Sequence, residues 1–376
     1  MYWLHVRYEA GKIEASRLPD SNARSLWRYA SRLPLSKEEN VVSLGEGWTP
    51  LIKCRGLAST LGLNDLYVKN EGVNPTFSFK DREVSVSISM AKELGLVPVA
   101  MASSGNAGSA LSAYSARGGV KSVILTPEYT PDEKTVQMTI YGSTVLKIKG
   151  TIEHCRRLVG EGSRRFHWTP FNTSILRSFA IEGTKTIAFE IFEQLDQIVP
   201  DTIVVPTGSG RGCMSIWKGF AELQAFGLIS RVPKFVSVQP SSLHPIADAI
   251  NGKVGAATGA RSIATALLVQ NPPDLDLVVN AVKSTGGHAL TVSDNEILGA
   301  EMLLAQEEGI FAEPSAASSI AALVKLKESG ELRQDERIVC VVTGCGLKDT
   351  ASARKATKQA PVLEPNLDSI APYIGH

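Results

Sequence analysis

The chain has 376 residues, of which 43% are hydrophobic and 20% are charged, as in a globular protein large enough for two domains. Its 39 lysines and arginines nearly balance its 38 aspartates and glutamates. The chain therefore lacks the positive electrostatic field that attracts nucleic acid or an anionic membrane. It contains no apolar stretch long enough to span a bilayer, and its first residues lack the apolar core of a signal peptide. We therefore expect a cytoplasmic protein that binds neither nucleic acid nor a membrane.

The five cysteines are widely spaced and include no Cys-x-x-Cys pair. This spacing disfavours both a zinc ribbon and a disulfide framework. The six histidines do not fall at metal-ligand spacing either. We expect reduced thiols and no bound metal.

From about residue 65 the chain repeats one pattern, in which a short β-branched run is followed by a small-residue turn and an amphipathic helix. Strands that alternate with helices indicate βαβ units and parallel sheets, hence an α/β fold. Several runs are apolar throughout, as expected where helices cover both faces of a sheet. We predict strands at 97–102, 122–127, 201–206, 234–240 and 336–343, and helices at 109–119, 131–142 and 213–227.

Three turns that follow these strands are rich in glycine or small polar residues, namely 103–108, 207–212 and 343–346. In open α/β sheets such loops gather at one edge, where ligands bind. We expect the three loops to converge on one polar site.

The loop 207–212 places Gly208, Gly210 and Gly212 in alternation between a strand and a helix. Its backbone N–H groups and the positive end of the next helix suit a phosphate monoester. It is no Walker loop, because no GK[ST] follows, and no Rossmann fingerprint, because Cys213 replaces the third glycine. A glycine-rich turn without a ligand remains the alternative.

The loop 103–108 also opens a helix, and Ser103, Ser104 and Asn106 offer polar groups beside the unpaired N–H donors of that helix start. Such an arrangement suits a carboxylate. Simple N-capping needs one such residue, so the surplus favours a binding role. Thr343 ends the last predicted strand, where a lone threonine ordinarily makes local hydrogen bonds.

Lys80 lies in NPTFSFKDRE (74–83), just before a predicted helix. Ser78 and Asp81 match a capping box, which would make Lys80 an ordinary solvated charge. The apolar residues before it favour a reactive role, because desolvation lowers the pKa of a lysine and makes its amine a nucleophile and a base. A desolvated lysine, a phosphate cradle and a carboxylate cradle together fit pyridoxal 5′-phosphate and an amino-acid substrate.

From residue 43 to residue 349 the chain resembles the threonine synthases and their relatives, the fold-type II pyridoxal-phosphate enzymes. The matching motifs, in order, are NPTFSFKDR, SSGNAGSALSAYSARGG, PTGSGRG, EGTKTIAFEIFEQL, GIFAEPSAAS and TGCGLKD. The resemblance implies two doubly wound, mostly parallel sheet domains with the cofactor in the cleft between them. It further implies a large cofactor-binding domain from residues 1–86 and 187–376, and a small mobile domain from residues 87–186.

The resemblance also implies roles for single residues. Lys80 would hold the cofactor as a Schiff base and then move the protons of the substrate. The cofactor would further contact Asn106 at its phenolic oxygen, Thr343 at its pyridine nitrogen, and Gly208, Ser209, Gly210, Arg211 and Gly212 at its phosphate. The substrate would contact Ser103, Ser104, Gly105, Asn106 and Ala107 with its carboxylate, and Lys134 and Gln137 with its own phosphate.

The chain departs from the family pattern at several positions. Phe77 stands where the family usually has glycine, Glu83 where it often has glycine, and Arg211 where asparagine or glycine is common. An arginine at position 211 would add a positive charge to the phosphate cradle.

The segment FNTSILRSFA (171–180) departs most. Ala180 occupies the place of an arginine that grips the substrate phosphate in the family. Asn172, Thr173 and Arg177 are the candidate substrate-binding residues of this segment, with Arg177 replacing the arginine from a shifted backbone.

The resemblance implies a lyase that converts O-phospho-L-homoserine and water to L-threonine and phosphate. The altered 172–180 segment leaves an alternative, β-elimination or β-replacement on serine, threonine, O-phosphoserine or a similar amino acid. A dinucleotide-binding protein or an inactive paralogue is disfavoured, because the dinucleotide fingerprint is broken while Lys80 and the loop glycines are present. By analogy with the family, we expect a homodimer.

Overall fold

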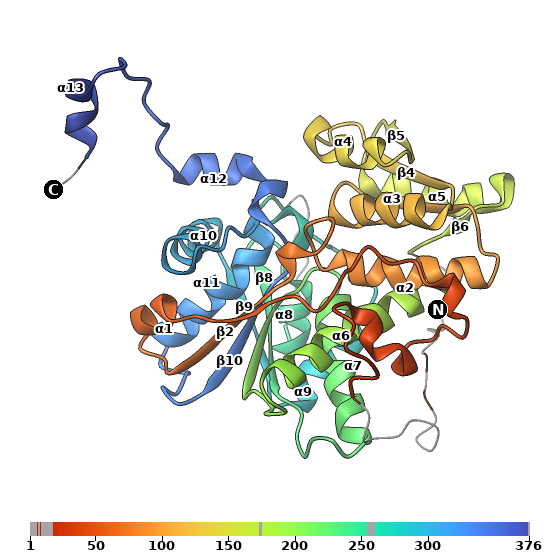
Figure 1. Cartoon of the computed structure of the whole chain (residues 1–376), viewed down its shortest axis with the longest axis horizontal. Helices are drawn as coiled ribbons and strands as arrows, with labels where there is room; N and C mark the ends of the chain where they lie inside the picture. Colours follow the sequence, from red (N-terminus) through yellow and green to blue (C-terminus); the bar gives the residue numbers. More distant parts are fainter. Residues whose placement is uncertain (1–5, 7, 9–17, 173–174, 254–259, 375–376) are drawn as a thin grey trace.

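A computed structural model of the chain describes residues 6, 8, 18–172, 175–253 and 260–374. In these residues the protein is an α/β fold with two sheets, both flanked by helices (Figure 1). The predicted fold class is confirmed. No helix in this part of the chain is both long and apolar enough to cross a bilayer.

The larger sheet has six strands in the order β1-β2-β10-β7-β8-β9. All neighbouring strands are parallel except β1, which runs antiparallel to β2. The strands are β1 (Leu51–Lys53), β2 (Asp65–Asn70), β7 (Thr202–Pro206), β8 (Lys234–Pro240), β9 (His288–Val292) and β10 (Arg337–Val342).

The smaller sheet has four parallel strands in the order β5-β4-β3-β6. Its strands are β3 (Val99–Ala102), β4 (Ser122–Pro127), β5 (Thr144–Ile148) and β6 (Thr169–Pro170). All the strands predicted from the sequence are therefore present, and β1, β2, β5, β6 and β9 are additional.

Helices connect the strands and cover the sheets (Figure 1). The three helices predicted from the sequence correspond to α3 (Asn106–Gly118), α4 (Asp132–Ile140) and α7 (Arg211–Ala225). The others are α1 (Gly56–Leu61), α2 (Lys80–Glu93), α5 (Ile152–Phe166), α6 (Leu176–Gln194), α8 (Pro245–Ile250), α9 (Leu275–Ser284), α10 (Asp294–Glu308), α11 (Pro314–Glu328), α12 (Thr350–Ala356) and α13 (Leu367–Ile370). The C-terminal segment with α13 extends away from the rest of the chain.

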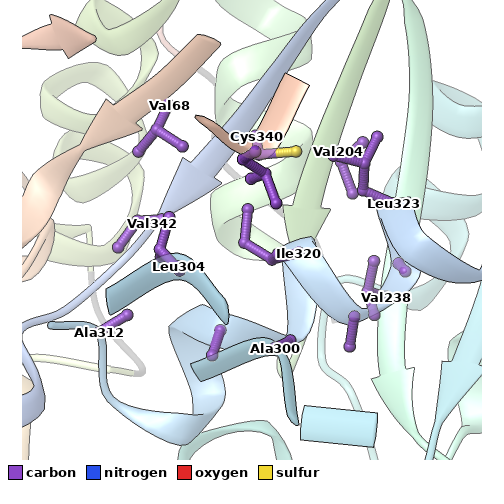
Figure 2. Packing of buried hydrophobic residues seen from close by; sticks show 14 of the residues in the cluster. Val68, Val204, Val238, Ala300, Leu304, Ala312, Ile320, Leu323, Cys340 and Val342 are labelled. Atoms are coloured by element: carbon purple, nitrogen blue, oxygen red, sulfur yellow. The ribbon is translucent and has the colours of Figure 1, made fainter. Parts of the chain in front are cut away.

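The central strand β10 is apolar from Ile338 to Val342, and both of its faces are buried. Cys340 lies opposite Val68 and Val204 in the neighbouring strands, and all three belong to the core under α10 and α11 (Figure 2). Val339 and Val341 alternate with it and belong to a second core under α6 and α7. Burying each such side chain contributes about 1.5–3 kcal/mol to stability. Alternate residues of β10 therefore stabilise the packing of helices on both faces of the sheet.

Helix α2, which begins at Lys80, packs directly on α6. A Cβ atom at Gly183 would lie only 1.9 Å from the carbonyl oxygen of Arg82, so only glycine permits this approach. The predicted domain boundaries after residues 86 and 186 fall inside α2 and α6, and the division into domains remains a prediction.

A buried ionic network fixes the first turn of α2. The guanidinium of Arg82 donates to Glu71 and to Glu190, each at 2.7 Å, and Lys69 donates to Glu190 at 2.7 Å. Burial favours the neutral form of Glu190, but Arg82 and Lys69 outweigh it and hold the pKa of this carboxyl well below its ordinary value. The network therefore joins α2 to β2 and α6 two residues after Lys80.

The predicted capping box at Ser78 and Asp81 is wrong. Helix α2 has Phe79 at its N-cap position and no side-chain cap. The Asp81 carboxylate instead accepts hydrogen bonds from the backbone N–H and the hydroxyl of Thr76, at 2.9 and 2.8 Å. Asp81 thus closes the turn that leads into the helix.

Candidate active site

The segment before Lys80 is bound to the turn that follows β10. The Phe79 N–H donates to the Thr343 carbonyl at 3.0 Å, and the Cys345 N–H donates to the Phe77 carbonyl at 3.1 Å. Ser78 and Gly344 form an isolated bridge between these two contacts. The end of a central strand therefore sets the position of Lys80.

The amine of Lys80 lies in a largely enclosed place. Its Nζ is 2.7 Å from Glu83 Oε1 and 4.2 Å from the centre of the Phe79 ring, and its side chain is 21% exposed. Burial lowers the pKa of this amine, Arg211 adds to the effect, and Glu83 opposes it. A lysine with a lowered pKa in reach of solvent can act as a nucleophile.

Phe77 adopts a backbone conformation that favours glycine. Its φ of 70° lies in the left-handed region that glycine enters without strain. Its side chain is half-exposed, so the phenylalanine is accommodated by pointing partly into solvent.

The loop 207–212 follows β7 and lies beside Lys80. Gly210 has a φ of 90°, and a Cβ there would lie 3.0 Å from Val278 Cγ1. A Cβ at Gly208 would lie 2.7 Å from the Ala266 carbonyl oxygen, and one at Gly212 would lie 3.5 Å from the Phe79 ring. Glycine at positions 208 and 210 therefore lets the backbone of this loop approach Ala266 and Val278 closely.

Arg211 begins helix α7 and is buried. Its Nη1 is 3.4 Å from Glu83 Oε2, so Glu83 lies between Lys80 and Arg211. The Nε of Arg211 is buried with no hydrogen-bond partner among the described residues. An orphaned guanidinium donor at the start of a helix is suited to an anion.

The loop 103–108 follows β3 of the smaller sheet and is joined to the 343–346 turn through Glu313. The Asn106 amide donates to both carboxylate oxygens of Glu313, at 3.0 and 3.1 Å. A Cβ at Gly344 would lie 2.7 Å from the Glu313 carboxyl. Burial raises the pKa of Glu313, against the opposing effect of Asn106.

The side chain of Ser103 holds the shape of its loop, because its hydroxyl accepts from the N–H groups of Gly108 and Gly105 at 2.9 and 3.3 Å. Ser104 is exposed, and Ala107 packs against the core of the smaller sheet. The structure thus brings all three predicted loops to the ends of β3, β7 and β10, around Lys80.

Thr343 is buried and directly follows β10. Lys134 and Gln137 lie on α4 and contact the turn after β10: Lys134 pairs with Asp349 at 3.1 Å, and Gln137 accepts from Lys348.

Arg177 is buried and pairs with Asp274, which precedes α9. Asp274 is also a neighbour of Gly210, so the pair lies beside the 207–212 loop. Asn172 is half-buried in the turn that follows β6, whereas Thr173 lies outside the described residues.

Sequence reasoning gave no role to Asp274, Glu313, Lys348 or Asp349, and noted Glu83 only as a departure from the family. Glu313 lies in the motif GIFAEPSAAS, and Lys348 and Asp349 lie in the motif TGCGLKD. Their place in these motifs could have identified them from the sequence. Asp274 lies in no such motif, and its position follows only from the fold.

The residues present fit pyridoxal phosphate. A phosphate would find the glycine loop, the start of α7 and the orphaned Nε of Arg211, while the pyridine nitrogen would find the hydroxyl of Thr343. Lys80 supplies an amine of lowered pKa between them. Among the described residues, no group of three or more His, Cys, Asp or Glu side chains could hold a metal ion.

Comparison with known proteins agrees with this fit. Residues 42–344 match the family described as "Pyridoxal-phosphate dependent enzyme". The threonine synthase of Methanocaldococcus jannaschii is 42% identical over 91% of this chain and 85% of its own length. That of Methanosarcina acetivorans is 38% identical over 96% and 89%.

Solved structures share the fold at lower identity. A processed form of threonine deaminase isoform 2 from Solanum lycopersicum has a TM-score of 0.72 at 21% identity, with 88% of this chain and 87% of that chain covered. Maize serine racemase has a TM-score of 0.71 at 21% identity, with 82% and 91% covered. The chain belongs to the pyridoxal-phosphate-dependent enzyme family, together with the threonine synthases that it matches over most of its length.

Proposed function

We propose that this protein converts O-phospho-L-homoserine and water to L-threonine and phosphate. The observation that carries the proposal is the amine of Lys80, which has a lowered pKa and lies among three loops suited to a phosphate, a carboxylate and a pyridine ring. The relatives of 42% and 38% identity, both named threonine synthase, support this choice of substrate.

The proposed site has two parts. Lys80, Asn106, Thr343 and the 207–212 loop hold the cofactor. The substrate is held by Ser103, Ser104, Gly105, Asn106, Ala107, Lys134, Gln137, Asn172, Thr173 and Arg177. The contact of Arg177 with Asp274 supports a role beside the cofactor phosphate loop, where its guanidinium adds to the charge of Arg211.

Pyridoxal phosphate, when bound, draws electrons from the substrate so that protons at Cα and Cβ become removable and the γ-phosphate can leave. Lys80 moves these protons, and burial supports this role because it lowers the pKa of the amine. Glu83 Oε1 accepts a hydrogen bond from the amine at 2.7 Å, and this bond holds Nζ in place when the amine is protonated. Asn106 is oriented by Glu313 for a hydrogen bond to the cofactor.

A second candidate function is β-elimination or β-replacement on serine, threonine, O-phosphoserine or a similar amino acid. Ala180 favours it, because this buried residue stands where the resemblance implies a phosphate-binding arginine. The hydroxyl leaving group of serine or threonine would need fewer cations than a phosphate.

We also propose that residues 87–186 move as a small domain against the rest of the chain. Closure of such a domain would exclude water other than the molecule that reacts. A homodimer in the cytoplasm is the expected assembly and location, by analogy with the family.

The test is an assay of the cofactor-loaded protein on both substrate classes. We expect equal amounts of phosphate and threonine from O-phosphohomoserine, and little ammonia from serine or threonine. Ammonia from the latter without phosphate from the former would replace the leading function by the second candidate. A Lys80→Ala variant should be inactive on every substrate.

A further inference from the structure

The carboxylate of Glu83 lies between the reactive amine and the start of the phosphate loop helix. Its Oε1 accepts a hydrogen bond from Lys80 Nζ at 2.7 Å, and its Oε2 lies 3.4 Å from Arg211 Nη1. Glu83 and Arg211 are both buried. One carboxylate therefore contacts both the amine on α2 and the arginine that begins α7.

Glu83 and Arg211 are also two of the positions at which this chain departs from the family pattern. A glycine at position 83 would bring no negative charge, and a glycine or asparagine at position 211 would bring no positive charge. Either charge alone would be costly to bury, because a buried ion without a partner loses its hydration uncompensated. The two together leave the net charge of the site unchanged, so they form a compensated pair.

Other charged groups near the amine act on it less directly. Burial lowers the pKa of Lys80, Glu83 opposes this shift, Arg211 adds to it, and Asp274 opposes it weakly. Asp274 is itself paired with Arg177 of α6. In the part of the chain that the structure describes, Glu83 is thus the carboxylate that pairs directly with the Lys80 amine.

We propose that Glu83 is a positioning residue for Lys80 and that Arg211 acts with it as a matched pair. Glu83 holds the ammonium of Lys80 whenever the lysine is free of the cofactor and carries a proton. Arg211 offsets the negative charge that Glu83 brings into the site, so that the amine can still lose this proton. The inference concerns Lys80 itself, goes beyond the proposed function, and holds for either candidate substrate.

The pair acts on the proton that Lys80 moves. When a carbon–hydrogen bond of the substrate breaks, Lys80 Nζ gains the proton, and the ammonium so formed donates to Glu83 Oε1. Glu83 remains ionised and stabilises the charged form of the amine, as an opposite charge at hydrogen-bond distance does. The proton therefore stays on Lys80, at a fixed place, until it is returned.

Pyridoxal, which lacks the phosphate, is the probe, because it tests Lys80 without a phosphate at Arg211. It is added to the full chain freed of its cofactor, and Schiff-base formation is followed by absorbance as the pH is varied, with Lys80→Ala as the blank for other lysines. We expect Glu83→Gln to move the midpoint to lower pH by about one to three units, because a close opposite charge is lost. Arg211→Gln should move it to higher pH, because a like charge is lost, and the double variant should lie between the two.

A midpoint that Glu83→Gln leaves in place, or one that Arg211→Gln moves to lower pH, would overturn the proposal. Arg211→Lys keeps the charge and should keep the midpoint near that of the wild type; a shift as large as that of Arg211→Gln would assign the effect to packing and overturn the pairing.

The matched control is Arg231→Gln, which removes an exposed pair with Asp201 ahead of β7 and should leave the midpoint unchanged. A shift in this control equal to that of Arg211→Gln would also overturn the pairing. Lack of turnover of O-phosphohomoserine would refute the proposed function alone, because the pyridoxal titration involves no substrate.

Discussion

The buried carboxyl group of Glu301 on α10 makes the stability of the fold depend on pH. Its side chain is 3% exposed, and neither carboxylate oxygen has a hydrogen-bond partner among the described residues. Burial, with a smaller effect of Asp349, raises its pKa from 4.5 to about 7. The unfolded chain therefore loses this proton at lower pH than the folded chain, and Glu301 destabilises the fold increasingly as the pH rises through this interval.

The size of the effect follows from the shift. One pKa unit corresponds to about 1.36 kcal/mol, so the full penalty is about 3 kcal/mol. Linkage distributes it as about 1 kcal/mol at pH 5, about 2 kcal/mol at pH 6 and about 3 kcal/mol at pH 8. Glu301→Gln removes the charge, and we expect it to raise the free energy of unfolding by these amounts.

Urea unfolding of the cofactor-loaded wild type and variant, at pH 5 and pH 8, measures the gain. The matched control is Glu328→Gln, which changes an exposed glutamate on α11 and should not alter stability at either pH. A gain of the same size at both pH values would refute the reasoning, because it would show that the carboxyl is not ionised differently in the folded and unfolded chains.

Three further changes test other parts of the structure. Phe77→Gly should raise the free energy of unfolding by about 1 kcal/mol, because φ is 70° and the side chain is half-exposed; a lower urea midpoint would contradict this. Arg82→Met should cost roughly 3–5 kcal/mol, because it removes the cation between the buried Glu71 and Glu190 and leaves Lys69 alone to pair with Glu190; a thermal midpoint near that of the wild type would count against the network. Glu83→Gln should lower the pKa of Lys80, since Glu83 opposes the effect of burial. The pH dependence of Schiff-base formation, followed by absorbance, should then move to lower pH, and an unmoved profile would exclude this coupling.

The elements of the fold that could be predicted are those whose residue pattern is visible within a short stretch of sequence. The predicted strand 234–240 coincides with β8, where Phe235, Val236 and Val238 mark a strand locally and are buried. The strands β5 and β9 were missed because they lie at sheet edges and are partly exposed, so their sequences carry no continuous apolar run. The capping box failed for another local reason, since Asp81 accepts from Thr76 instead.

The candidate site also contains residues that the local sequence predicts and residues that it does not. Lys80 and the three loops were predictable because glycine, serine and lysine mark them within a few residues. Their ionic partners were not, because Glu313 meets Asn106 across 207 residues and Asp274 meets Arg177 across 97. Such pairs depend on the order of the strands and on the packing of α2 against α6, and spacing along the chain does not reveal them.

Borohydride reduction of the cofactor-loaded enzyme, followed by peptide mapping, is the most direct test of the placement of Lys80. The reduction makes the bond between a lysine and pyridoxal phosphate permanent. We expect the cofactor on the peptide that contains Lys80, and none on that peptide in Lys80→Ala. Cofactor on the peptide of another lysine, such as Lys185 or Lys348, or on no peptide at all, would contradict the assignment.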